Sequence, residues 1–341
     1  MSVGRDALLY LDEARVAELC GTVDPLRVVA DAFQAVREGR AAVTPEAALR
    51  WTAPDGTAAR SLILPARHVD SYGCKIINAC LGNVDRGLPR ADGLIVLFDP
   101  DTAAPVCLMD AGHISALRTA AVSVAAVGAV LDLSDIRRVA FLGCGRQSRT
   151  HLDLLGSRCP LSAVTVYDTE PQRAVLFAKQ AKLSLPEVTI DIADTAEAAV
   201  RSAPLTIAAT TTTTAYVRPE WLPDGATFVN VSLDDATEDL LLGCDHLFVD
   251  DWTLVSDDDT RLLGRLARAG RVAGPDQVPP PGARNIDAEF ATLLAGAYQR
   301  PIAKTDRVVI NPFGMGVHDI ALAAHVYAAA RSGDTGVRLP R

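Results

Sequence analysis

The chain has 341 residues, a length that accommodates two domains, each with its own buried core. Its net charge of −9 and its pI of about 5.2 argue against nucleic acid as a partner, because binding phosphates requires clustered Lys and Arg. The composition, 49% hydrophobic and 22% charged, is typical of a soluble globular protein.

The N-terminal segment MSVGRDALLYLDEARVAEL carries charges between its apolar residues and lacks the continuous apolar stretch of a signal peptide or membrane helix. We therefore expect a cytoplasmic protein that does not bind membranes. The seven cysteines form no CxxC pair and the six histidines no HExxH motif. Reduced thiols and the absence of a metal site are predicted.

The first third of the chain has an α+β pattern. Apolar residues at helical spacing between Asp12 and Arg37 predict one or two amphipathic helices. Short apolar runs separated by Gly, Pro and Asp predict strands, at residues 48–51, 59–64, 72–79, 93–99 and 106–110. The small residues of 113–131 then predict a helix that connects two domains.

After residue 131 strands and helices alternate, which predicts a doubly wound parallel sheet. The expected strands are 139–142, 164–167, 205–209 and 227–231, with helices at 150–155 and 173–183. A proline-rich loop over 274–283 leads out of this unit. From Val308 onward a strand, a Gly-rich turn and a helix at 319–330 are expected, and this helix rejoins the first domain.

The strongest local motif is RRVAFLGCGRQSRTHLDLL, an apolar strand followed by two glycines and the start of a helix. Gly143 permits the tight turn, and Gly145 lets the backbone approach a pyrophosphate at the positive end of the helix. The third glycine position of the fingerprint is Ser148, a departure that lowers its specificity.

Asp168 ends the next strand, AVTVYD, roughly 20 residues further on, where an acid binds the ribose hydroxyls of a dinucleotide. An Asp there repels a 2′-phosphate, so the pattern predicts NAD rather than NADP. The alternative is an α/β domain with an unused turn.

The segment ATTTTT, residues 209–214, follows another strand, and its threonines either contact the cofactor or cap the next turn.

Several blocks occur in the order typical of the ornithine cyclodeaminase/μ-crystallin family: CKIINACLGN, GLPRADGLIVLFD, ISALRTAAVS, GCGRQS, VYD and NPFGMGVHDIALA. The chain resembles this family over nearly its whole length. The resemblance implies a substrate-binding and dimerisation domain made of residues 1–125 and 300–341, with an NAD-binding Rossmann domain, residues 126–299, inserted between them. It also implies a homodimer and a small amino-acid-like substrate with carboxylates.

One block separates the activities within that family. Cyclodeaminases carry a Gly-Gly-Asp-Cys-Pro-like segment where this chain has FVNVSLDDATEDLL. Its Ser-Leu-x-Asp form resembles the enzymes that cleave N-(2-amino-2-carboxyethyl)-L-glutamate oxidatively to 2,3-diaminopropionate and 2-oxoglutarate for siderophore or peptide antibiotic biosynthesis. The resemblance thus implies an NAD-dependent dehydrogenase acting on a carbon–nitrogen bond.

Three alternatives remain open. The first is an ornithine or lysine cyclodeaminase that recycles its bound NAD, and the second is an imine reductase. The third, a non-enzymatic μ-crystallin-like binding protein, is disfavoured because Lys75, Arg118 and Asp235 are all present.

Four cations are candidates for binding substrate carboxylates. Lys75 lies in the apolar run YGCKIIN, where a lysine either reaches out to solvent or faces a site. The resemblance implies the site, where Lys75 binds a substrate carboxylate or acts as a catalytic residue that polarises the reacting group. Arg118 resembles the family arginine near the cofactor phosphates and the substrate carboxylate. Arg50 and Arg90 border strand-like runs, and a surface position is the alternative for both.

Asp235 is the candidate general acid/base, just beyond the strand that ends at Val231. Asp234 is the competing residue, and the Ser-Leu-x-Asp match selects Asp235. In the alternative reading both acids cap a helix at 238–241. The residues expected at the cofactor lie in or beside the matching blocks: Arg118, Thr119, Gly143, Gly145, Arg146, Gln147, Asp168, Thr210, Thr211 and Ser232.

Overall fold

The computed structural model describes residues 7–340, which belong to two compact units. The first contains the chain up to Arg118 and from Met315 onward, and the second runs from Thr119 to Gly314. The sequence analysis set these boundaries at 125/126 and 299/300. The second boundary differs because β17 (Val308–Asn311) pairs with strands of the second unit.

The first unit is built on a mainly antiparallel sheet with the order β18-β1-β7-β6-β5-β4-β2, in which β3 also pairs with β4. Its strands are β1 (Ala7–Leu11), β2 (Ala41–Val43), β3 (Ala47–Thr52), β4 (Ala58–His68), β5 (Ser71–Cys80), β6 (Ala91–Phe98), β7 (Pro105–Asp110) and β18 (Val337–Pro340). The predicted strands between residues 48 and 110 correspond to β3 through β7. The structure adds β1, β2 and β18, which the sequence analysis did not predict.

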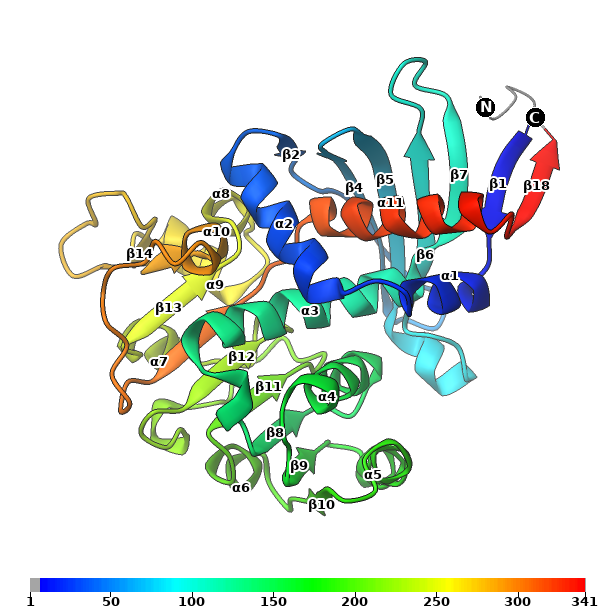
Figure 1. The fold of residues 1–341 in the computed structure, drawn as a ribbon. Coiled ribbons are helices and arrows are strands. Elements are labelled where there is room, and N and C mark those ends of the chain that lie inside the picture. Colours follow the sequence, from blue (N-terminus) through cyan, green and yellow to red (C-terminus); the bar gives the residue numbers. More distant parts are fainter. Residues whose placement is uncertain (1–6, 341) are drawn as a thin grey trace. The chain divides into compact units, whose positions relative to one another are not determined.

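One face of this sheet is covered by helices. The helix α11 (Gly316–Ser332) lies across β4, β5 and β6 and also packs against α1 (Glu13–Cys20) and α2 (Pro25–Arg37), as Figure 1 shows. The amphipathic segment after Asp12 is thus two helices. The second begins where Asp24 caps the N-terminus and Pro25 occupies the first turn.

The opposite face of the sheet carries exposed apolar side chains. Successive side chains of a strand point to opposite faces of the sheet. Ile63 and Leu94 are each one residue away from a Cα partner of Lys75, so they lie on the face opposite to Lys75. The register of β3 with β4 places Leu49 and Trp51 on the same face as Ile63. Leu49 is 67% exposed and Trp51 is 47% exposed. A short 3-10 helix, η1 (Leu81–Arg86), connects β5 to the loop before β6.

The helix α3 (Gly112–Val130) carries the chain from the first unit into the second. By length and hydropathy alone it meets the criteria for a membrane span, which the buried core helices of soluble proteins also meet. Its predicted range of 113–131 agrees with the structure to within one residue at each end.

The second unit contains a parallel sheet with the order β10-β9-β8-β11-β12-β17-β13-β16. Its strands are β8 (Arg138–Leu142), β9 (Ala163–Tyr167), β10 (Thr189–Ile192), β11 (Leu205–Ala208), β12 (Thr227–Asn230), β13 (His246–Val249), β16 (Ala288–Glu289) and β17. The chain builds outward from β8 through β9 to β10 and then returns to β11 on the other side of β8. This is the doubly wound Rossmann arrangement, which confirms the predicted fold class.

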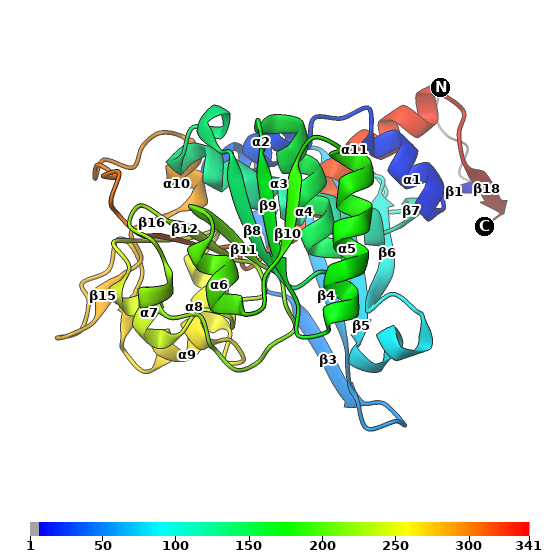
Figure 2. The ribbon, with the colours of Figure 1, turned by 90° about the horizontal axis from the view of Figure 1, so that it is seen from below.

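Helices connect these strands. They are α4 (Arg146–Arg158), α5 (Pro171–Ser184), α6 (Ala196–Arg201), α7 (Glu238–Gly243), α8 (Trp252–Asp257), α9 (Leu262–Arg268) and α10 (Phe290–Leu294). α5 packs on β9 and β10, and α6 packs on β8 and β9 (Figure 2). The remaining short elements are η2 (Leu133–Asp135), η3 (Pro219–Trp221), β14 (Val272–Ala273) and β15 (Arg284–Asn285).

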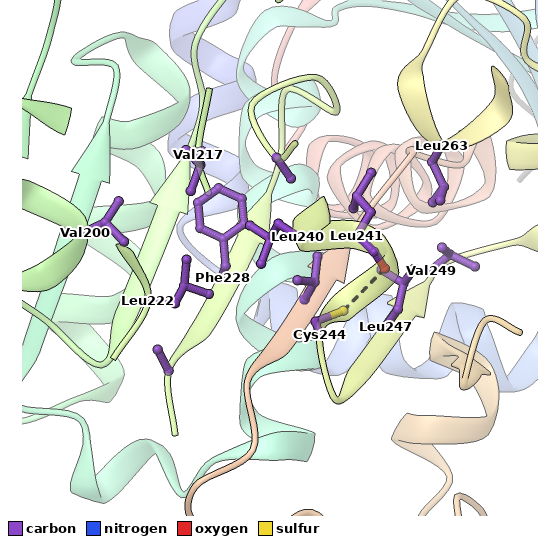
Figure 3. Close-up of a cluster of buried hydrophobic side chains, with 14 of the residues drawn as sticks. Val200, Val217, Leu222, Phe228, Leu240, Leu241, Cys244, Leu247, Val249 and Leu263 are labelled. Atoms are coloured by element: carbon purple, nitrogen blue, oxygen red, sulfur yellow. Dashed lines mark hydrogen bonds between the residues drawn. The ribbon is translucent and has the colours of Figure 1, made fainter. Parts of the chain in front are cut away.

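A buried apolar cluster fixes the part of the sheet that carries the acidic turn (Figure 3). Phe228 of β12 packs in it with Leu240 and Leu241 of α7, and all three side chains are fully buried. Burying each of them stabilises the fold by about 1.5–3 kcal/mol. The cluster therefore anchors β12 and α7, the two elements on either side of residues 231–237.

Candidate active site

The turn after β8 leaves space in front of a helix N-terminus. Gly143 has a φ of +86°, and a Cβ there would lie 2.7 Å from the carbonyl oxygen of Ala209, so only glycine fits without strain. Gly145 is the N-cap of α4, and no side chain caps the helix there. A Cβ added to Gly145 would have no atom within 4 Å. Ser148, at the third fingerprint position, is buried and donates a hydrogen bond to the carbonyl of Gly143.

Asp168 stands at the carboxyl end of β9, and backbone groups orient its carboxylate. Oδ2 accepts a hydrogen bond from the N–H of Cys144 at 2.8 Å, and Oδ1 accepts one from the N–H of Glu170 at 2.9 Å. A carboxylate oxygen has two acceptor sites, so each oxygen can still accept a ribose hydroxyl. An uncapped helix N-terminus, an open glycine and an oriented acid together fit NAD, as predicted.

In the first unit, Lys75 and Arg118 converge on Asp319. Lys75 Nζ lies 2.7 Å from Asp319 Oδ2 and donates to Ser115 Oγ at 3.4 Å. Arg118 Nε donates to Asp319 Oδ1 at 3.2 Å. Lys75 is 1% exposed and Asp319 is fully buried. The lysine therefore does not reach out to solvent, and it shares one acid with the predicted arginine.

The charges of this cluster favour a bound anion. Two cations contact one carboxylate, so the three side chains carry a net charge of +1. The pKa of Lys75 is lowered to about 8, first by burial and then by the positive charge of Arg118, while Asp319 and Glu46 act in the opposite direction. A substrate carboxylate would balance the remaining charge.

Asp235 is buried in the second unit, at the carboxyl end of β12. Its carboxylate accepts hydrogen bonds from the hydroxyls of Thr210, Tyr216 and Ser232. Burial raises its pKa above the ordinary value for Asp, the hydrogen bonds from the three hydroxyls lower it, and the neighbouring charge of Asp234 raises it. A raised pKa is typical of a carboxylate that exchanges protons near neutral pH.

Asp234 has a different environment. Its carboxylate accepts hydrogen bonds from Arg261 Nη1 at 3.1 Å and from the N–H of Leu262 at 2.8 Å, at the start of α9. The N-cap of α7 is Thr237, whose side chain accepts from the N–H of Leu240. Neither acid therefore caps the helix after the turn, and Asp234 holds α9 instead.

The other predicted residues lie at the edges of these clusters. Arg146 begins α4, Gln147 follows it, Thr119 lies on α3, and Thr211 is exposed after β11. In the first unit, Arg50 is exposed on β3 and Arg90 is half-buried before β6.

Sequence reasoning missed three polar residues near the predicted ones: Asp319, Tyr216 and Arg60. Asp319 lies in the NPFGMGVHDIALA block, where an acid within an apolar helix was an available signal. Arg60 is the direct cross-strand partner of Arg50 and lies on the same sheet face as Lys75. Tyr216 lies in an irregular loop without a spacing rule.

The Rossmann sheet, the glycine turn and the oriented acid of the second unit define a dinucleotide-binding protein, whose first unit carries a buried cationic cluster. The chain belongs to the ornithine cyclodeaminase/mu-crystallin family, whose model matches residues 9–334. The N-((2S)-2-amino-2-carboxyethyl)-L-glutamate dehydrogenase of Staphylococcus aureus is 28% identical over 255 residues, which cover 74% of this chain and 73% of that protein.

Two solved structures have the same fold. The crystal structure of CmnK is 35% identical, superposes with a TM-score of 0.89 and covers 98% of both chains. An archaeal alanine dehydrogenase, a dimer with bound NAD, is 21% identical with a TM-score of 0.81, and the match covers 98% of this chain and 99% of that one.

Proposed function

We propose that this protein is an NAD-dependent oxidoreductase that oxidises the C–N bond of an N-substituted amino acid. The proposed substrate is N-(2-amino-2-carboxyethyl)-L-glutamate, and the products are 2,3-diaminopropionate and 2-oxoglutarate. The observation that carries the proposal is the buried carboxylate of Asp235 at the carboxyl edge of the Rossmann sheet, in a Ser-Leu-x-Asp turn. The S. aureus relative bears the name of this activity.

The NAD pyrophosphate would bind at the N-terminus of α4 beside Gly145, and the ribose hydroxyls would bind Asp168. When bound, NAD accepts a hydride from the carbon that bears the nitrogen. Arg118, Thr119, Arg146, Gln147, Thr210, Thr211 and Ser232 are the further residues proposed near the cofactor.

Asp235 would take one proton from the protonated secondary amine of the substrate. The lone pair that this frees on nitrogen forms the C=N bond as the adjacent carbon loses its hydrogen with two electrons. Water then adds to the iminium carbon and the C–N bond breaks, which leaves a keto acid and a primary ammonium group. One water is consumed, two electrons leave the substrate, and the proton on Asp235 is released to solvent.

Lys75 and Arg118 would bind the carboxylate next to the reacting carbon, because their shared cluster has a net positive charge. The proposed substrate has two further carboxylates. Arg50 and Arg60 are directly opposite on β3 and β4, which places two cationic residues next to each other on one face of the sheet. We propose this pair and Arg90 as the partners of the remaining carboxylates.

We further propose that the protein works in the cytoplasm as a homodimer and supplies 2,3-diaminopropionate for siderophore or peptide antibiotic synthesis. The archaeal alanine dehydrogenase of the same fold is a dimer. The apolar face formed by Leu49, Trp51, Ile63 and Leu94 supports a subunit interface on the first unit.

The adjacent acids provide a matched test of the proposed chemistry. Asp235→Asn should preserve folding and NAD binding but lower kcat by about 10² or more, because the amide is not a base. Asp234→Asn should retain most activity, although it removes the carboxylate at the start of α9. The comparison requires turnover of N-(2-amino-2-carboxyethyl)-L-glutamate with NAD. If Asp234→Asn is inactive and Asp235→Asn is active, the assignment of the base is wrong.

A further inference from the structure

The carboxylate of Asp235 is surrounded by hydroxyl donors of the second unit. Thr210 Oγ1 lies 2.7 Å from Oδ1, and Tyr216 Oη lies 3.1 Å from the same oxygen. Ser232 Oγ donates to Oδ2. Asp235 itself is fully buried. We refer to Thr210, Tyr216 and Ser232 as the hydroxyl set.

Backbone groups direct two of these hydroxyl protons toward Asp235. Thr210 Oγ1 accepts a hydrogen bond from the N–H of Thr212 at 3.1 Å, and Ser232 Oγ accepts one from the N–H of Thr210 at 3.0 Å. Each hydroxyl has a single proton, and the backbone N–H groups occupy acceptor sites. The proton of Ser232 can be donated to Asp235 Oδ2 or, over 3.4 Å, to the carbonyl of Ala208, and the carboxylate is the nearer acceptor. The arrangement therefore suits the ionised form of Asp235, which only accepts hydrogen bonds.

A count of acceptor sites distinguishes the two carboxylate oxygens. A carboxylate oxygen has two acceptor sites. Among residues 7–340, Oδ1 accepts from Thr210 and Tyr216, which fills both of its sites, whereas Oδ2 accepts from Ser232 alone. Oδ2 therefore has one acceptor site that no described residue fills.

We propose that Oδ2 of Asp235 is the atom that takes the substrate proton, and that Tyr216 and Thr210 are positioning residues that hold Oδ1 so that Oδ2 stays available. This inference rests on the proposed function, in which Asp235 is the base. It assigns a role to Tyr216 and gives Thr210 a role in addition to cofactor contact.

The local backbone supports this assignment. Leu233 has a φ of +76°, a conformation that costs a bulky residue about 1–3 kcal/mol, and it lies between Ser232 and Asp235. The strained turn brings the side chains of Ser232 and Asp235 together. In the threonine-rich segment, the N–H groups of Thr212 and Thr214 bond to the hydroxyls two residues earlier. The segment thus caps its own turns and presents Thr210 to Asp235.

The test compares pH profiles of kcat/KM for wild type, Tyr216→Phe and Thr210→Val, with N-(2-amino-2-carboxyethyl)-L-glutamate and NAD. Each variant removes one hydrogen bond that favours the ionised carboxylate. The pKa on the acid side of the profile should therefore rise by about one unit in each variant. Tyr298→Phe is the matched control, since its hydroxyl bonds to His246 and Asp287, and its profile should match wild type.

A second readout does not depend on activity. NMR titration of protein labelled with ¹³C at the Asp carboxyl carbons, with the Asp235 signal assigned by its loss in Asp235→Asn, should show the same upward shift. A lower rate with unchanged pKa values in both variants would overturn the inference, because it would indicate a purely structural role. If Asp235→Asn is as active as wild type, the proposed base itself is wrong. If Asp235→Asn is inactive and neither variant shifts, the error lies in the hydroxyl set alone.

Discussion

Lys75 has a buried ammonium group and shares its acidic partner, Asp319, with Arg118. Asp319 offsets part of the cost of burying Lys75, and Arg118 increases it. The pKa of Lys75 is therefore lowered to about 8, with burial as the largest cause. The lysine is cationic at neutral pH and loses its charge within an accessible pH range.

This titration predicts a pH dependence for carboxylate binding. Below about pH 8 Lys75 is protonated and attracts a carboxylate, and above that pH it becomes neutral. The affinity for 2-oxoglutarate, which has no titrating amine, should thus fall roughly tenfold for each pH unit above the pKa. Calorimetric titration of the NADH-bound protein between pH 7 and 9.5 measures this. NADH binding over the same range is the control, and a constant 2-oxoglutarate affinity would contradict the proposed role of Lys75.

A functional residue could be predicted from the sequence where a short motif indicates it, and not where its role depends on a contact with a residue far away in the chain. The sequence motif selected Asp235 over Asp234, and the structure adds a physical reason, since Asp234 is held by Arg261 and Leu262. Asp319 was missed because it is 244 positions from Lys75 in the chain. No local pattern indicates a contact over such a separation.

In the strand–turn–helix unit, Gly143 and Gly145 meet two different requirements. Gly143 is needed for the fold of the turn, and Gly145 is needed for cofactor binding. Gly143 has left-handed backbone geometry and no room for a Cβ. Gly145 has an ordinary φ of −88° and open space in front of it. The turn itself needs the first glycine, and a bound pyrophosphate needs the second.

The two glycines should therefore respond differently to the same substitution. Gly143→Ala should lower the free energy of unfolding by about 1–3 kcal/mol through strain and contact with Ala209. Gly145→Ala should leave stability nearly unchanged and weaken NAD binding by at least about tenfold, or ~1.4 kcal/mol, because the methyl group fills the phosphate position. Thermal denaturation and calorimetry with NAD measure the two effects. Tight NAD binding by Gly145→Ala would argue against the cofactor position.

The sequence predicted β8, β9, β11, β12 and β17 of the parallel sheet and missed β10, β13 and β16. The buried strands β8, β9, β11 and β12 have apolar runs long enough to identify them in the sequence. The terminal strands β1 and β18 were missed because β18 is short and mostly exposed and pairs with β1 from the far end of the chain. β17 was identified as a strand, but its sheet depends on long-range pairing with β12 and β13.

At the scale of the whole molecule, the apolar face of the first sheet predicts self-association. Trp51→Glu, combined with Leu49→Glu, should convert a dimer to a monomer, because each side chain loses about 1.5–3 kcal/mol of burial. Leu183→Glu, on a residue that is 85% exposed in α5, is the matched control and should remain dimeric. Sedimentation should give about twice the 36.0 kDa chain mass for wild type. A wild-type monomer at micromolar concentration would contradict the proposed interface.

We expect this chain to oxidise a C–N bond with net consumption of NAD. The most direct measurement is a substrate panel in which NADH and ammonia are followed together. With N-(2-amino-2-carboxyethyl)-L-glutamate and NAD, we predict one NADH and one 2-oxoglutarate per turnover and no ammonia. Conversion of ornithine or lysine to a cyclic imino acid, with ammonia release and no net NADH, would contradict the account and identify a cyclodeaminase.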